Sequence, residues 1–305
     1  VVSSLGKGIT AASLGHLLKA RGYSVMMQKM DPYLNVDPGT MSPFQHGEVF
    51  VTEDGHECDL DLGHYERFID ENLLCESNFT QGSIYKELIS RERHGDFLGG
   101  TVQVIPHVTD AIKGKLYRIA ERSQADFVIT EIGGTVGDIE SQPFIEAARQ
   151  FKNEQFPGNV IFVHCTLVPY IAAAHEIKTK PTQHSVKELR SMGVQPDFIV
   201  CRSDHEITLK VREKIAAFCD VPVDNVLACE DSPSIYEVPI KLHEQEFEAK
   251  VLAHVGLSIR RCNLKPLQSF LKAMNSCTDS VKIGIVGKYT SLPDAYLSVI
   301  EALHH

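Results

Sequence analysis

The stretch that decides the fold is Ser3-Ser4-Leu5-Gly6-Lys7-Gly8-Ile9-Thr10. Its glycines let backbone N–H groups turn towards phosphate oxygens, a following helix presents its positive end, and Lys7 adds a charge. The common form of such a loop places Ser or Thr directly after the lysine. Gly8 stands there instead, so a hydroxyl for a metal ion would have to come from elsewhere. Gly-Lys-Gly also occurs in plain turns, but its position before a helical pattern favours a nucleotide phosphate site.

Helical and strand patterns alternate along the rest of the chain. Apolar residues recur at helical spacing over residues 9–21 and stop at Gly22, which favours a helix end. Further helices are expected at residues 85–93 and 107–122. Strands are expected at residues 23–29, 101–105, 127–130, 160–163, 198–201 and 225–228. This order predicts an α/β fold with a doubly wound, mainly parallel sheet whose ligands bind beyond the carboxyl ends of the strands.

Composition excludes several functional classes. Thirty basic and forty acidic side chains give the 305 residues a net charge of -10, which argues against binding to nucleic-acid polymers. No apolar run approaches the length of a membrane span, and none of the eight cysteines forms a CxxC pair. We therefore expect a cytoplasmic protein with reduced thiols that contacts neither membrane nor nucleic acid.

The two ends of the sequence are abrupt. The chain begins inside the phosphate loop and closes on a strand pattern at residues 282–287 and a helical pattern at residues 294–303. We expect a protein truncated at both ends, with a second domain beginning near the C-terminus.

Several charged residues follow expected strands. Lys29 precedes a Pro- and Gly-rich loop, and it suits either a phosphate contact or an ordinary solvated lysine equally well. Asp61 and Glu131 are both expected at strand ends on the side of the phosphate loop, where one or two carboxylates would suit magnesium. Asp59 is better interpreted as a helix cap or turn residue.

A second basic segment runs from Lys178 to Gln183, before a helix expected to start near Ser185. Two lysines two residues apart in an extended segment point the same way, although a solvated basic turn would look similar. A phosphate loop plus a second anion site suggests two nucleotides and phosphoryl transfer, which depends mostly on positioning and charge.

Long runs of this sequence resemble the CTP synthase family. The matching runs include SSLGKGI (3–9), KMDPYLNVDPGTMSP (29–43), DLDLGHYERF (59–68), EIGGTVGDIES (131–141), KTKPTQHSVKELR (178–190) and VGKYTSLPDAY (286–296). The resemblance, nearest to bacterial forms, implies a P-loop NTPase-like amidoligase domain of the dethiobiotin-synthetase type at residues 1–255. It further implies a linker at 256–280 and the first strand and helix of a class I glutamine amidotransferase domain at 281–305.

The activity implied by this resemblance is the ATP-dependent amination of UTP to CTP through a 4-phosphorylated intermediate. Ammonia would come from glutamine hydrolysed in the C-terminal domain, so this chain alone would be at most ammonia-dependent. The family also implies Mg²⁺, activation by GTP, feedback inhibition by CTP, and a homotetramer that builds the UTP sites and sometimes forms filaments.

The resemblance also assigns residues to roles. Lys7 and Lys29 match the catalytic lysines, and Asp61 and Glu131 match magnesium ligands. ATP contacts match Ser4, Leu5, Gly6, Lys7, Gly8, Ile9, Asp61, Arg202, Glu230, Asp231 and Ser232. UTP and CTP contacts match Ser3, Asp138, Ile139, Glu140, Lys178, Thr179, Lys180, Pro181, Thr182, Gln183 and Lys214. The ammonia tunnel matches Pro43, His46 as its gate, and Val49. One departure is His175, which stands where the family has Gly and puts a triphosphate contact in doubt.

Three alternatives remain open at this point. Another P-loop ligase, such as a dethiobiotin synthetase or cobyrinic acid amidase, would lack the runs at 29–43 and 178–183. A partitioning-type switch protein would lack a second triphosphate site and a tunnel. A chain retained only as a filament or interaction module would make no CTP.

Overall fold

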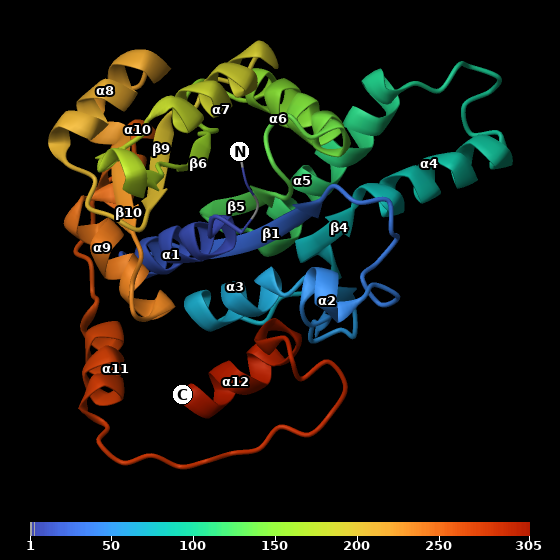
Figure 1. The fold of residues 1–305 in the computed structure, drawn as a ribbon. Helices are drawn as coiled ribbons and strands as arrows, with labels where there is room; N and C mark the ends of the chain where they lie inside the picture. Colours follow the sequence, from blue (N-terminus) through green and yellow to red (C-terminus); the bar gives the residue numbers. More distant parts are fainter. Residues whose placement is uncertain (1, 3) are drawn as a thin grey trace.

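A computed structural model describes residue 2 and residues 4–305. Six parallel strands form two three-stranded sheets (Figure 1). In the first, β1 (Val25–Asp31) lies between β4 (Asn78–Thr80) and β5 (Phe127–Ile132). In the second, β9 (Phe198–Ser203) lies between β6 (Val163–Leu167) and β10 (Val226–Glu230). The prediction of an α/β fold with parallel strands is confirmed, with the strands divided between two sheets.

Helices cover both faces of each sheet. They are α1 (Lys7–Ala20), α2 (Pro43–His46), α3 (Asp61–Ile69), α4 (Gln81–His94), α5 (Thr109–Ser123), α6 (Gln142–Glu154), α7 (Lys180–Ser191), α8 (Leu209–Cys219), α9 (Val238–Glu244), α10 (Phe247–His254), α11 (Lys265–Ser276) and α12 (Leu297–His304). Two short antiparallel ribbons pair β2 (Phe50–Val51) with β3 (Glu57–Cys58) and β7 (Tyr170–Ile171) with β8 (Glu176–Ile177). None of the helices described is long and apolar enough to cross a membrane.

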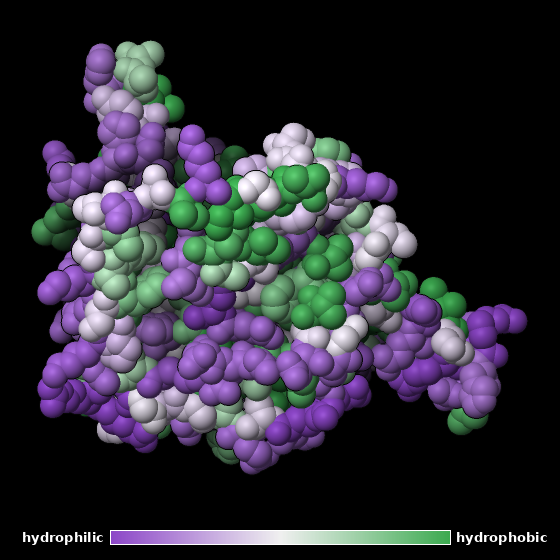
Figure 2. Space-filling model, turned by 90° about the horizontal axis from the view of Figure 1, so that it is seen from below, coloured by the Kyte–Doolittle hydropathy of each residue, from purple (hydrophilic) through white to green (hydrophobic). Residues whose placement is uncertain are grey.

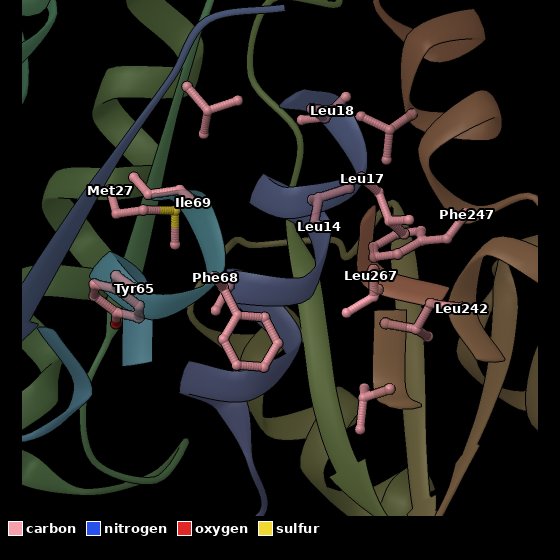
Figure 3. Close-up of a cluster of buried hydrophobic side chains, with 14 of the residues drawn as sticks. Leu14, Leu17, Leu18, Met27, Tyr65, Phe68, Ile69, Leu242, Phe247 and Leu267 are labelled. Carbon is pink, nitrogen blue, oxygen red and sulfur yellow. The ribbon is translucent and has the colours of Figure 1, made fainter. Parts of the chain in front are cut away.

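The largest core cluster joins the two sheets through α1. Leu14, Leu17 and Leu18 of α1 belong to one buried cluster with Met27 of β1 and Phe247 of α10 (Figure 3). The same cluster contains Phe198 of β9. On the other face of the first sheet, Met30 packs in a separate cluster with residues of α4, α5 and α6. Because side chains alternate between the faces of a strand, β1 directs Val25 and Met27 to α1 and Met30 to the opposite layer. This arrangement places the N-terminus of α1 beside the carboxyl ends of β1 and β5.

Two expected strands are absent from the described residues, and a third is displaced. Residues 101–105 are mostly exposed and lead into a π-helical segment, Val104–Val108, before α5. Residues 282–287 form no strand and are almost entirely exposed. β6 begins at Val163, three residues later than the start expected. An apolar run becomes a strand only where a neighbouring strand satisfies its backbone groups, and neither exposed run has such a neighbour here.

The surface is mixed in polarity. Seen from below the view of Figure 1, hydrophobic side chains gather in central groups that are surrounded by hydrophilic ones (Figure 2). Large exposed apolar side chains are spread along the chain, among them Leu98, Ile139, Phe156, Phe218 and Val286.

Candidate active site

The phosphate loop leads directly into α1. Ser4 and Gly6 both adopt positive φ, and the helix begins at Lys7 with no acidic residue in its first turn. This leaves the positive end of α1 free to face an anion. Lys7 Nζ donates to the carbonyl of Gly134 at 2.8 Å, which ties the loop to the segment after β5. Leu5 and Ile9 flank these residues, and Ser3 lies outside the described residues.

Gly8 is required by a close approach of side chains. A Cβ at this position would run into the carboxylate of Asp61 and lie 3.3 Å from Glu131 Oε2. The glycine that replaces the usual Ser or Thr after the lysine therefore makes room for two carboxylates beneath the first turn of α1.

Three elements bring Lys29, Asp61 and Glu131 together. Parallel pairing of β1 with β5 sets Lys29 opposite Glu131, and Asp61 is the first residue of α3. Lys29 Nζ donates to Asp61 and, at 3.1 Å, to Glu131 Oε1, and it lies 3.9 Å from Asp59 Oδ1. Lys29 is only 5% exposed, so the interpretation as a solvated lysine is wrong. The expected position of Asp61 at a strand end is also wrong, because Asp61 starts α3. Glu131 is the second-last residue of β5 and therefore lies near a strand end, as expected.

Asp59 has the turn role expected for it. Its Oδ1 accepts a hydrogen bond from the backbone N–H of Asp61 at 2.9 Å, just before α3. This bond fixes the entry into the helix and thereby the direction of Asp61.

Tyr65 is a site residue that is not among those expected. Its hydroxyl donates to Glu131 Oε2 from within α3. The signal in the sequence is its spacing of four residues from Asp61, which places both side chains on one face of a helix. That spacing is informative only once α3 is known to begin at Asp61.

The electrostatics of the cluster follow from burial and from Lys29. Burial raises the pKa of Asp59 to about 8 and that of Asp31 to about 6. Burial also opposes ionisation of Asp61, yet Lys29 outweighs it and holds the pKa of Asp61 below its usual value. Burial and the neighbouring Asp61 raise the pKa of Glu131. One ammonium thus faces more carboxyl groups than it can pair with, and a cluster of carboxyl oxygens suits a hard divalent cation, whose charge would favour their ionised form.

Arg202 belongs to β9 of the second sheet, and its side chain reaches the phosphate loop. Its side chain donates to the carbonyl of Cys229 at 2.6 Å, and it pairs with Asp231 at 2.7 Å. Its Nε is 3.8 Å from where a Cβ of Gly6 would lie. Glu230 accepts from the backbone N–H of Ile207 at 3.0 Å. The fold therefore brings Arg202 near the loop and pairs it with Asp231.

The second basic segment differs from its expected form. α7 begins at Lys180, so Lys178 and Lys180 do not share one extended segment, and that expectation is wrong. Lys178 pairs with Glu176, whereas Lys180 Nζ lies 5.5 Å from the ring centre of Phe218. The reason is that Pro181 occupies the first turn of the helix, where its missing N–H has no cost.

The other residues expected in this part lie around α7. Gln183 Nε2 donates to Thr179 Oγ1 at 3.0 Å, and Thr182 Oγ1 donates to the carbonyl of Leu167 at 3.0 Å. The segment with Asp138, Ile139 and Glu140 lies beside the same helix, since a Cβ at Gly137 would lie 3.6 Å from the side chain of Glu188. Ile139 is 77% exposed. Lys214 is exposed on α8.

His175 adopts a conformation that glycine tolerates best. Its φ is 49° and its ψ is 40°, in the left-handed region. Its Nδ1 lies 3.4 Å from the hydroxyl of Tyr170, whose ring stacks on His205. The turn therefore keeps a glycine-type backbone while it carries an exposed imidazole.

The three tunnel candidates lie in one loop. Pro43 and His46 begin and end α2, and Val49 precedes β2. The ring of His46 packs edge-on against Tyr33 at 5.2 Å, and burial lowers the pKa of His46. Residues near the C-terminus cover this loop, because Phe44 packs against Tyr289 and Glu48 contacts Ser298.

Comparison with known proteins gives one family. The model of the CTP synthase N-terminus matches residues 1–257. A CTP synthase of Symbiobacterium thermophilum is 60% identical over 306 residues, one of Staphylococcus carnosus 59% over 306, and one of Bacillus subtilis 57% over 305. Each alignment covers 100% of this chain and 57% of the relative, so the chain spans little more than half the length of these proteins. The family match extends over most of the chain and includes every element that carries the carboxylate cluster, and the chain therefore belongs to the CTP synthase family.

Proposed function

We propose that this chain is the synthetase part of a CTP synthase and aminates UTP to CTP with ATP. The observation that carries this proposal is the convergence of Lys29, Asp61 and Glu131 beneath the first turn of α1. A helix end with Lys7 can hold a triphosphate, and buried carboxylates beside it can hold a metal ion.

In the proposed reaction, the γ-phosphoryl group of ATP moves to the 4-oxygen of UTP and ADP leaves. Ammonia then adds to C4, and phosphate leaves with the former 4-oxygen to give CTP. Mg²⁺, held by Asp61 and Glu131, would supply charge neutralisation on the phosphates. Lys7 would stabilise the transferred group, and Lys29 would orient the carboxylates and face both nucleotides.

The remaining site assignments belong to the same proposal. Ser4 to Ile9, with Asp61, would hold the ATP phosphates, and Arg202 with residues 230–232 would hold adenine. UTP and its competitor CTP would contact Ser3, residues 138–140, residues 178–183 and Lys214. Thr182 and Gln183 are buried, which supports a binding segment that is already ordered before UTP binds. To contact UTP, Lys178 would have to leave Glu176 and Lys180 would have to leave Phe218.

The organisation of the full protein is also proposed. Residues 1–255 form the synthetase domain, residues 256–280 a linker that includes α11, and residues 281–305 the start of a glutaminase domain. Glutamine would supply ammonia past Pro43, His46 and Val49, with GTP as activator. Exposed apolar residues such as Ile139 and Phe218 support a homotetramer in the cytoplasm, and filaments would be built from such tetramers.

The test combines the complete gene product with UTP, ATP, Mg²⁺ and ammonium chloride and follows CTP by absorbance and chromatography. CTP formation that is lost in Lys29→Met supports the proposal. ATP hydrolysis without CTP would instead identify a switch protein. A product formed from a different acceptor would identify another ligase. Replacing ammonium by glutamine tests the glutaminase separately.

A further inference from the structure

Tyr65 lies at the base of the carboxylate cluster and contacts the residue proposed to bind the metal. It is fully buried, with 0% of its surface exposed, in the core beside α1 (Figure 3). Asp61 and Tyr65 are four residues apart in α3, so one face of this helix carries both side chains. The hydroxyl of Tyr65 donates to Glu131 Oε2.

Two donors from different elements fix the carboxylate of Glu131. Lys29 Nζ, from β1, donates to Oε1 at 3.1 Å, and Tyr65, from α3, donates to Oε2. The terminal torsion of a glutamate side chain is broad when nothing holds it. Because each oxygen of Glu131 accepts a hydrogen bond, the carboxylate has one fixed orientation. Tyr65 and Asp61 both belong to α3, so this orientation is also fixed with respect to Asp61. The remaining lone pairs lie next to Gly8, where a Cβ would be 3.3 Å from Oε2.

We propose that Tyr65 is a positioning residue that orients Glu131 for a divalent cation at the phosphate loop. This inference rests on the proposed function, because that function assigns the cation to Asp61 and Glu131. Hydrogen-bond partners behind metal ligands typically change metal affinity by about 10- to 100-fold when they are removed. Helix α3 would therefore supply one metal ligand, Asp61, and also Tyr65, which orients the second ligand, Glu131.

A purely structural role makes a different prediction. In that case the hydroxyl only satisfies a buried carboxylate, and its loss lowers stability without changing metal affinity. Tyr65→Phe separates the two roles because it keeps the ring and its packing and removes only the hydroxyl.

A matched control is Tyr23→Phe. Tyr23 is also buried, and its hydroxyl donates to the carbonyl of Ser258 at 2.6 Å, before β1 and away from the carboxylates. This variant loses a buried hydrogen bond of the same kind, so it measures the loss of folding stability that is unrelated to metal binding.

The experiment measures Mn²⁺ binding by electron paramagnetic resonance, with a non-hydrolysable ATP analogue and no turnover. We expect Tyr65→Phe to bind Mn²⁺ about tenfold more weakly and Tyr23→Phe to bind it normally. In the complete gene product, the Mg²⁺ concentration for half-maximal CTP formation should rise by a similar factor in Tyr65→Phe, and saturating Mg²⁺ should restore the rate.

Unchanged Mn²⁺ affinity in Tyr65→Phe, with a stability loss like that of Tyr23→Phe, would overturn the inference and leave the proposed function intact. Absence of Mn²⁺ binding in the unmodified protein would overturn the metal assignment of the proposed function, and the inference with it.

Discussion

Glu48 caps the N-terminus of α12 through Ser298, 250 residues later in the chain. Its Oε2 accepts the backbone N–H of Ser298 at 2.9 Å, its Oε1 accepts the hydroxyl, and its own N–H donates to the carbonyl of Asp294 at 2.8 Å. Since Glu48 follows His46 by two residues, the loop with the proposed tunnel residues is attached to the C-terminal segment.

Removal of this cap should loosen α12. In Glu48→Gln the negative charge at the positive helix end is lost, which typically costs about 0.3 to 1 kcal/mol. Amide hydrogen exchange should become faster at residues 298–301, and Glu244→Gln, an exposed substitution on α9, should leave it unchanged. Equal exchange in both variants would show that Glu48 does not hold the helix.

Loss of Lys29 should destabilise the metal-free protein strongly. Lys29→Met leaves the buried carboxylate of Glu131 and the half-buried carboxylate of Asp61 without their cation, a change that costs on the order of 3 kcal/mol. Mg²⁺ should restore stability more in this variant than in the unmodified protein, because it replaces the missing charge. Thermal unfolding with and without Mg²⁺ measures the difference, and Lys29→Arg, which keeps the charge, should lose less.

Gly8→Ala should disturb the site although alanine favours helices. The new Cβ would meet the carboxylate of Asp61, and overpacking of this kind costs about 1 to 3 kcal/mol. Chemical denaturation and ATP binding should both show a loss. Gly114→Ala is the control, because its Cβ would meet nothing within 4 Å in α5, and it should gain up to about 1 kcal/mol. If Gly8→Ala changed neither stability nor ATP binding, the side chain of Asp61 would have to move away from the new Cβ without cost, and the prediction would be wrong.

His164 should make stability depend on pH. Burial lowers its pKa to about 4 from the ordinary value of 6.5, and its Nε2 lies 2.9 Å from Ser185 Oγ. Between pH 6.5 and 4 the unfolded chain binds the proton that the folded protein excludes, so stability falls as pH falls through this range. The loss approaches about 3 kcal/mol at most, since one unit of pKa corresponds to about 1.4 kcal/mol.

The measurement is urea denaturation at pH 7 and pH 4.5. His164→Gln should lose less stability between these values than the unmodified protein, and the exposed His184→Gln should behave like the unmodified protein. His16 and His64, whose pKa values burial also lowers, remain in all three proteins and cancel in the comparison. An unchanged pH dependence in His164→Gln would contradict the prediction.

The pattern of apolar residues within a segment was enough to predict some helices and strands. The helical spacing of residues 9–21 and the stop at Gly22 correspond to α1, and the run at residues 127–130 lies within β5. The runs at 101–105 and 282–287 look similar but remain exposed. Apolar content alone could not distinguish them, because a strand depends on a partner from elsewhere in the chain.

By itself, the sequence determined the α/β class, the phosphate loop and, through family resemblance, the residues to examine. Only the tertiary structure decided which of them meet. The parallel register that sets Lys29 opposite Glu131 joins residues 102 positions apart, and the start of α3 at Asp61 decides that Tyr65 faces Glu131. Contacts of this kind depend on how strands pair and helices pack, which no local spacing encodes. The net charge of -10 likewise says nothing of one buried lysine among carboxylates, because electrostatic effects in a site depend on distance and burial.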